Sequence, residues 1–370
     1  MSSYMITIDI TPKKNTNLTQ GVSKDNHYFG CKSQREKIMF DNNKIVIEGH
    51  RSNNIAVNNA FSTVRSTYYM SILKTFIYYL ANYGAFNINR IVFDVDNGKS
   101  ETLKIEKDKF NDSFCKPINF VFPKEKLEEI FEIENTQNAF FTALVYQVCA
   151  VEANNIFENF ANSWRCFNCI YNRVNGNIKD KDGITRVLNE IETDSSPLLE
   201  DTVNDSWKFM QHLKDSRLIN WFNRETKKKG NVDSFVNILG IKRYQDKDLI
   251  ERLQEVAKEI FDKIEKDVAL IKERKGNDEG IVTPKDQRDK YKNIQKLKGK
   301  TSYKFDYLLI TISYTMYLRN KYFHGEYGYP QILFKNNDRL DELNATAAIL
   351  QKLNWVLLEK YYSKLYETNF

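Results

Sequence analysis

The stretch Asp306-Tyr-Leu-Leu-Ile-Thr-Ile-Ser-Tyr-Thr-Met-Tyr-Leu318 and its continuation Arg319-Asn-Lys-Tyr-Phe-His-Gly325 determine how the C-terminal half of the chain is interpreted. Apolar side chains dominate the first part, polar and charged ones follow, and a glycine ends the run, as at many helix C-termini. We therefore predict a helix over residues 303–323. Its apolar part is too short for a membrane helix, which needs about 18 uninterrupted apolar residues.

Helical patterns flank this run on both sides. A long periodic segment spans residues 126–171 with a break near 134–137, and a closing amphipathic helix is expected over residues 337–366. Between them lies a stretch rich in charge, about 225–304, whose last part is almost devoid of apolar side chains. Residues 124–370 are therefore expected to form an all-α domain that carries a charged insertion.

The first 123 residues mix strand and helix signals instead. Short stretches show the alternation of half-buried strands, and two of the gaps between them contain the turn signals Asp41-Asn-Asn43 and Asn97-Gly98. We therefore predict an α+β N-terminal domain over residues 1–123, followed by the all-α domain, in a chain that is mainly α overall. The strand patterns cover residues 4–10, 37–40, 44–48, 91–96 and 101–105, and a helical pattern covers about 58–83.

Composition limits the class of protein. The net charge of the 370 residues is only +6, so a nucleic-acid partner is permitted but not required. The sequence shows neither a secretory signal nor a membrane-length apolar run. Its five cysteines are an odd number scattered along the chain, which does not indicate a disulfide framework. We therefore expect a cytoplasmic protein that does not enter a membrane.

Arg319, Asn320 and His324 carry groups suited to phosphodiester chemistry. A guanidinium binds two phosphate oxygens, an imidazole transfers protons near neutral pH, and an amide orients either of them. With about 100° per helical residue, Asn320 and His324 lie about 40° apart on one face, whereas Arg319 and His324 lie about 140° apart. Spacing alone leaves a structural alternative, in which Arg319 forms a surface ion pair and His324 ends the helix, where the dipole favours a cation.

Arg319-Asn-x-x-x-His324 resembles the Arg-polar-x(3 or more)-His motif of the HEPN superfamily, helical domains of which many are metal-independent endoribonucleases. The apolar helix before the motif, Gly325 after it and the closing amphipathic helix are also similar to that superfamily. So is the aromatic pattern Trp164-x-x-Phe-Asn-x-x-Tyr-Asn172 further upstream. The resemblance covers about residues 125–370, apart from the charged insertion, which the minimal domain lacks.

The resemblance implies that Arg319 contacts the scissile phosphate, that His324 acts as general acid or base, and that Asn320 fixes their geometry. It implies RNA cleavage by the ribose 2′-hydroxyl, without metal or cofactor, in a cleft completed by a homodimer, as in prokaryotic antiphage defence or toxin systems. One alternative is a non-catalytic HEPN-like module that binds a nucleotide or a protein. A further alternative gives the function to the N-terminal domain, whose regulatory partner or ligand no motif identifies.

Basic and aromatic residues lie directly before the motif helix. They are expected to attract an RNA backbone and to stack on bases, with a solvated flexible arm as the equal alternative. These predicted RNA-binding residues are Lys296, Lys298, Lys300, Tyr303 and Lys304.

Other polar residues have structural explanations first. Asn168 interrupts the apolar stripe of its helix, so it either bonds a neighbouring helix, which we favour, or lines the cleft. Cys166 and Cys169 lack a second ligand pair for zinc. Asp94 and Asp96 share one face of a strand, but they precede a turn, where acidic residues are common. We predict no metal site.

Overall fold

The described part of the chain contains an antiparallel sheet followed mostly by helices, so the predicted order of an α+β region and then a helical region is confirmed. The chain forms two compact units, Met1–Ile170 with Tyr361–Phe370, and Tyr171–Lys360. A division into domains after residue 123 stays a prediction. The computed structural model describes residues 2–14, 18, 21–27, 34–63, 66–110, 114–135, 137–176, 180–213, 217, 221, 304–323 and 338–367.

Six strands form one antiparallel sheet in the order β2-β3-β4-β1-β5-β6. The hairpins predicted around residues 41–43 and 97–98 are both confirmed. Gly98 adopts a φ of 86°, which residues with a side chain rarely take, and so permits the tight turn. The strands are β1 Ser2–Pro12, β2 Val22–His27, β3 Arg35–Phe40, β4 Lys44–Arg51, β5 Phe86–Asp96 and β6 Ser100–Glu106.

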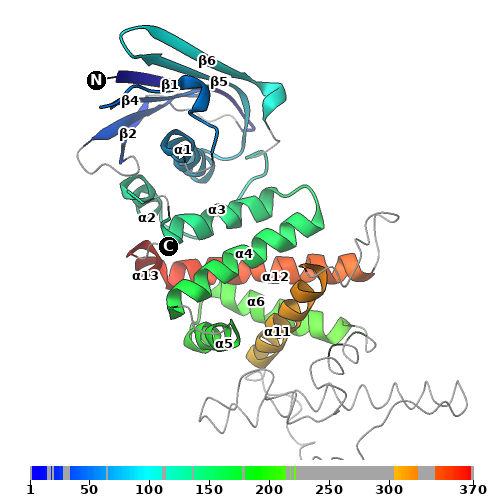
Figure 1. Cartoon of the computed structure of the whole chain (residues 1–370). Coiled ribbons are helices and arrows are strands. Elements are labelled where there is room, and N and C mark those ends of the chain that lie inside the picture. The colour runs from blue at the N-terminus through cyan, green and yellow to red at the C-terminus, as the bar shows by residue number, and fades with distance from the viewer. Residues whose placement is uncertain are drawn as a thin grey trace, which may run out of the picture. The chain divides into compact units, whose positions relative to one another are not determined.

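One face of the sheet is buried against helix α1, Thr67–Tyr83, as Figure 1 shows. Alternation places Ile6 and Ile8 of β1 on this face, where both are completely buried, while Met5 on the opposite face is 38% exposed. Phe40 of β3 reaches the ring of Tyr78 on α1, with centroids 5.3 Å apart. Period-two alternation over residues 4–10 therefore predicted the buried face correctly.

Helix α1 begins later than its sequence pattern predicts. The apolar spacing suggested a start near residue 58, but Val57–Asn59 form a 3-10 turn and α1 starts at Thr67. The Ser62 hydroxyl donates to the carbonyl oxygen of Asn59 at 2.8 Å. Short polar side chains of this kind offer the backbone an alternative to helical bonding, which apolar spacing alone does not reveal.

The helices that follow are more interrupted than predicted. The break expected near residues 134–137 is present, but a second break at residues 153–155 divides the remaining segment. Asparagines mark both restarts: Asn138 accepts from the backbone N–H of Phe141 at 3.0 Å, and Asn155 accepts from that of Glu158 at 2.9 Å. The elements are α2 Lys124–Glu128, η3 Glu129–Glu132, α3 Ala139–Glu152, α4 Ile156–Asn175 and, at the C-terminus, α13 Tyr362–Glu367.

The second unit is built on α6, which packs against α11 and α12 (Figure 1). The ion pair of Asp205 with Lys352 (2.7 Å) and that of Arg217 with Glu342 (2.8 Å) show that α6 and α12 are antiparallel. The helix predicted over residues 303–323 is confirmed. The remaining charged insertion lies outside the described residues. The helices are α5 Asp180–Ile191, α6 Pro197–His212, α11 Lys304–Phe323 and α12 Asp338–Lys360.

A buried polar cluster lies between the sheet and α1. Its centre is Glu36 of β3, which is completely buried and accepts hydrogen bonds from Tyr4, from Asn26 (2.5 Å) and from Arg51 (3.2 Å). A buried carboxylate needs such partners, because its charge has lost its hydration. The arginine also lies over the rings of Tyr4 and Tyr68, each at 4.9 Å from the ring centroid.

Lys74 of α1 extends this cluster and is also completely buried. Its Nζ donates to Asn26 Oδ1 at 3.0 Å, to the carbonyl oxygen of His27 at 3.0 Å and to that of Ile133 at 2.7 Å. Burial lowers the pKa of Lys74 to about 7, although Glu36 and two further glutamates nearby oppose the shift. One ammonium group thus connects β2, α1 and the segment before α3.

Replacing Gly49 of β4 by alanine is expected to destabilise the protein by about 1–3 kcal/mol, because the added methyl group overpacks a buried site. An ideal Cβ at this position would lie 2.5 Å from the hydroxyl of Tyr4 and 2.6 Å from its Cζ. Urea unfolding measures the change. Gly21→Ala is the control, since its nearest neighbour, the oxygen of Phe40, is 3.7 Å away. Equal stability of the two variants would contradict the prediction.

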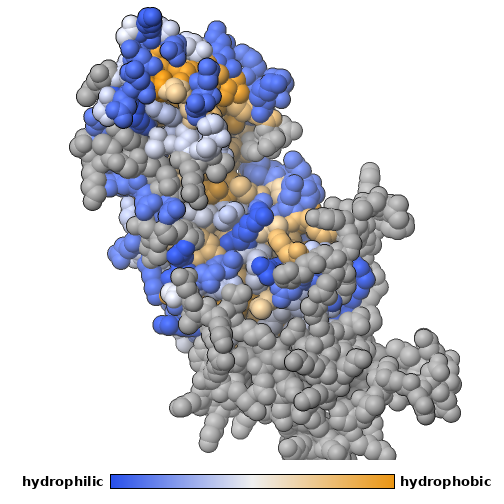
Figure 2. All heavy atoms as spheres, viewed as in Figure 1, coloured by the Kyte–Doolittle hydropathy of each residue, from blue (hydrophilic) through white to orange (hydrophobic). Residues whose placement is uncertain are grey.

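The face of the molecule seen in Figure 2 is largely hydrophilic where residues are coloured. Among the described residues, large apolar side chains are exposed only at Met5, Tyr69, Trp207 and Phe323. None of the helices in the described part combines the length and the apolar character needed to cross a membrane.

Candidate active site

Helix α11 is buried along most of its length and becomes accessible at its C-terminal end. Leu308 and Ile312 are completely buried, whereas Arg319 and Asn320 are half-buried and Phe323, the last residue, is 45% exposed. The apolar first part of the helix explains this gradient, because it supplies the core of the second unit. Arg319 and Asn320 therefore lie where α11 reaches the surface.

The guanidinium of Arg319 is turned toward the C-terminal end of α11. Its Nη1 donates to Asn320 Oδ1 at 2.8 Å, and its Cζ lies 5.6 Å from the ring centroid of Phe323. Successive helical residues point about 100° apart, so the arginine stem must bend to reach its neighbour. Guanidinium and amide consequently form one polar group at the end of the helix.

No carboxylate pairs with Arg319 among the residues that the structure describes. Other arginines of the chain differ: Arg217 pairs with Glu342 at 2.8 Å, and Arg51 pairs with Glu36 at 3.2 Å. The Nε of Arg319 is buried without a hydrogen-bond partner within the same described set. The surface ion pair that would give Arg319 a purely structural role is therefore not seen there.

Most other predicted site residues fall outside the described part of the chain. Lys304 is the first residue of α11, but its side chain is not described. The roles predicted for Lys304 and for the residues outside the described ranges stay predictions. The residues concerned outside the described ranges are Lys296, Lys298, Lys300, Tyr303 and His324, the last of which directly follows α11.

Asn168 is half-buried on α4 and has an interaction partner. It belongs to the unit Met1–Ile170, whereas Arg319 belongs to Tyr171–Lys360. A role in lining a cleft with Arg319 stays a prediction.

The residues considered as metal ligands have structural roles. Asp96 accepts from the backbone N–H of Gly98 at 2.8 Å, and Asp94 accepts from the hydroxyl of Thr102 at 2.6 Å, as expected beside a turn. Cys166 and Cys169 are buried in α4. Within the described ranges, no group of three or more histidine, cysteine, aspartate or glutamate side chains is placed to hold a metal ion.

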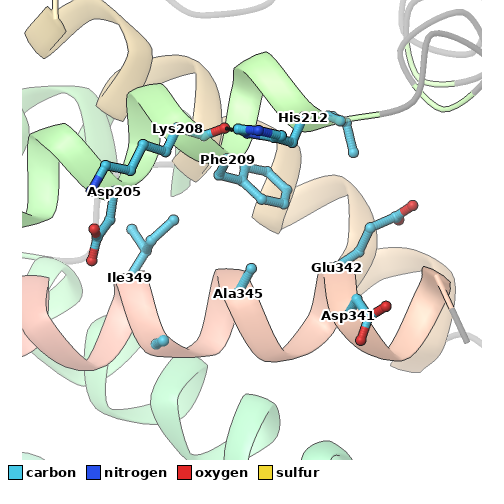
Figure 3. Close-up of a pocket in the computed structure, with 10 residues that line it drawn as sticks. Asp205, Lys208, Phe209, His212, Asp341, Glu342, Ala345 and Ile349 are labelled. Carbon is cyan, nitrogen blue, oxygen red and sulfur yellow. Dashed lines mark hydrogen bonds between the residues drawn. The ribbon is translucent and has the colours of Figure 1, made fainter. Parts of the chain in front are cut away.

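A pocket of about 460 Å³ lies between α6 and α12 (Figure 3). Its lining is mostly apolar and includes Phe209 and Leu213 from the α6 side and Ile349 of α12. Charged side chains stand at its two ends, with Lys208 at one end and Asp341 at the other. A mostly apolar lining with a few polar groups is typical of ligand sites.

Glu342 connects the pocket to α11. It lines the pocket and accepts from Tyr314 of α11 at 3.1 Å and from Arg217 at 2.8 Å. Burial raises the pKa of Glu342, and the arginine opposes that shift. Tyr314 precedes Arg319 by about 7.5 Å along the helix axis, at 1.5 Å per residue. No local pattern indicates this arrangement, because Glu342 lies among the polar positions of an amphipathic helix and its partners are distant in the chain.

Comparison of the chain with family models, with curated proteins and with solved structures finds no match.

Proposed function

We propose that the helical part of this chain is a metal-independent endoribonuclease of the HEPN type, with Arg319, Asn320 and His324 as its active-site residues. The observation that supports the proposal is the set of contacts that the Arg319 guanidinium makes. Its guanidinium has no carboxylate partner in the described part of the chain, is joined to Asn320 at 2.8 Å and is turned toward the helix end that His324 follows. An arginine held in this way is suited to bind a phosphate through two N–H groups.

The reaction needs no external nucleophile. A base removes the proton of a ribose 2′-hydroxyl, the 2′-oxygen attacks the adjacent phosphorus, and an acid donates a proton to the departing 5′-oxygen. The products are a 2′,3′-cyclic phosphate and a 5′-hydroxyl. Arg319 stabilises the charge that develops on the phosphorane, and His324 transfers a proton. Asn320 holds the guanidinium in place through the bond from Nη1.

One chain contains a single Arg-Asn-x-x-x-His motif, so we propose that a homodimer supplies the second histidine. One imidazole then acts as the base and the other as the acid. The basic residues Lys296, Lys298, Lys300 and Lys304, with Tyr303, attract and stack on the RNA. Antiphage defence or toxin action in a prokaryotic cytoplasm is the setting that we propose for this activity.

The test is cleavage of a single-stranded RNA by the purified full chain in excess EDTA. We expect cleavage to continue, with 2′,3′-cyclic phosphate ends identified by mass spectrometry. The same oligonucleotide with 2′-O-methyl groups is the control, and it should stay intact because its nucleophile is blocked. Cleavage that stops in EDTA, or that proceeds on the methylated strand, would refute this mechanism.

The second candidate is a non-catalytic nucleotide-binding module. The pocket between α6 and α12 favours this second function, because its lining is mostly apolar, charged side chains lie at its ends and it lies outside the Arg319 motif. Under this alternative no RNA is cut, while nucleotide binding persists.

A further inference from the structure

We propose that the pocket between α6 and α12 binds a guanine base. The inference goes beyond the ribonuclease proposal and rests on it only where the guanine belongs to an RNA strand. Three features of the pocket support it: aromatic side chains, an acceptor group at one end and a cation at the other (Figure 3).

The aromatic side chains come from α6. Phe209 and His212 lie on the same side of the pocket, with Ala345 and Ile349 of α12 on the opposite side (Figure 3). The His212 ring is held by a hydrogen bond of 2.8 Å between its Nδ1 and the oxygen of Lys208. Since a carbonyl oxygen only accepts, this contact requires the tautomer that has its proton on Nδ1. Aromatic faces of this kind stack on unpaired bases.

The carboxylate at one end of the pocket determines which of the four bases fits. The Asp341 carboxylate makes no hydrogen bond or ion pair with any residue that the structure describes, and Glu342 lies beside it in the sequence of α12. A carboxylate has two acceptor oxygens and no donor. Guanine presents two adjacent N–H donors on one edge, which match these two oxygens. Adenine and cytosine each place an acceptor next to their amino group, and uracil has a single N–H between two carbonyl groups.

The other end supplies a cation for a phosphate. Asp205 there is paired with Lys352 at 2.7 Å. Lys208 has no carboxylate partner within the described ranges and projects at this end of the pocket (Figure 3). The carboxylate, the apolar middle of the pocket and the ammonium group therefore follow one another in the same order as the donor edge, the rings and the phosphate of a guanine nucleotide. The acidic end alone would repel a phosphate, which argues that the base occupies it.

The test is calorimetric titration of the full chain with GMP, AMP, CMP and UMP. We expect GMP to bind at least about 10-fold more tightly than the other three, the discrimination that one good bidentate pair provides. Asp341→Asn should weaken GMP binding about 10-fold, because its amide replaces one acceptor by a donor. Phe209→Leu keeps the apolar volume beside Tyr314 but removes the stacking face, so it should weaken all four nucleotides.

Asp201→Asn is the matched control, since Asp201 is exposed on α6 and does not line the pocket. It should leave GMP affinity unchanged. A second titration uses oligouridylate with and without one guanosine, on Arg319→Ala so that cleavage of the strand is slow. Preference for the guanosine strand identifies RNA as the source of the base, and preference confined to GMP identifies a free nucleotide.

Equal binding of the four nucleotides, no binding of either GMP or the guanosine strand, or equal effects of Asp341→Asn and Asp201→Asn would overturn the proposal. A chain that binds GMP selectively but cuts no RNA would refute the ribonuclease proposal alone.

Discussion

Arg319→Ala is expected to lower the rate of RNA cleavage by about 100-fold to 1,000-fold, which is the usual effect of removing one preorganised donor to a developing negative charge. Its stability cost should be small. The side chain gives up one hydrogen bond to Asn320 and one contact with the ring of Phe323, together about 1–2 kcal/mol. Single-turnover cleavage of a labelled RNA measures the rate, and circular dichroism checks the fold.

Three further variants sharpen this result. Arg319→Lys keeps the charge but loses the planar fork, so it should recover only part of the rate. Arg165→Ala is the matched control, because Arg165 of α4 likewise donates to a nearby asparagine, Asn162, at 3.1 Å but lies outside the motif. It should cut RNA at the wild-type rate. His324→Ala is expected to be as inactive as Arg319→Ala, and wild-type rates in both would remove the motif from the active site.

Lys74→Met is expected to destabilise the first unit by about 3–5 kcal/mol, the range for removing one partner from a buried charged group. The variant leaves Asn26 Oδ1 and the carbonyl oxygens of His27 and Ile133 without their shared donor. Urea unfolding followed by tyrosine fluorescence measures the change. Lys37→Met, at an exposed position on β3, is the control and should lie within about 0.5 kcal/mol of wild type.

The lowered pKa of Lys74 also predicts that the free energy of unfolding depends on pH. Its pKa is about 7 in the folded protein and higher in the unfolded chain, so between pH 7 and pH 9 the unfolded state binds more protons. The free energy of unfolding must then rise with pH, by up to about 1.4 kcal/mol per pH unit. This slope should be absent from Lys74→Met. Identical slopes in the two proteins would show that Lys74 stays protonated when folded.

Local patterns predicted local structure well. Alternation over residues 4–10 identified a strand and its buried face, and the Asn97-Gly98 signal identified its hairpin, because both depend on neighbouring residues only. Apolar spacing also predicted α11 to within a residue, although it placed the start of α1 too early because it ignores competing polar side chains.

Long-range polar contacts could not be predicted. No motif in the sequence marks Lys74, and its three acceptors come from residues 26, 27 and 133. Glu342 is bonded to Arg217 and Tyr314, and no motif in the sequence marks it. Neither position carries a local signal, since its neighbours in space are remote in sequence. The motif predicted Arg319 as a site residue but did not indicate that its guanidinium would bond to Asn320, because residue spacing does not determine the rotamer of a long side chain.

The short helix α13 has a practical consequence for work with fragments. The side-chain amide of Asn138 donates to the oxygen of Tyr366 at 2.6 Å, and the hydroxyl of Tyr362 donates to Glu129 at 2.5 Å. The first unit is therefore discontinuous, and the last residues of the chain complete it. A protein shortened at its C-terminus would lose support for α3 near its N-terminal end, while a fragment made of the early residues alone would lack a piece of its own core. Limited digestion within the second unit, by contrast, would leave two fragments that still hold each other through α13.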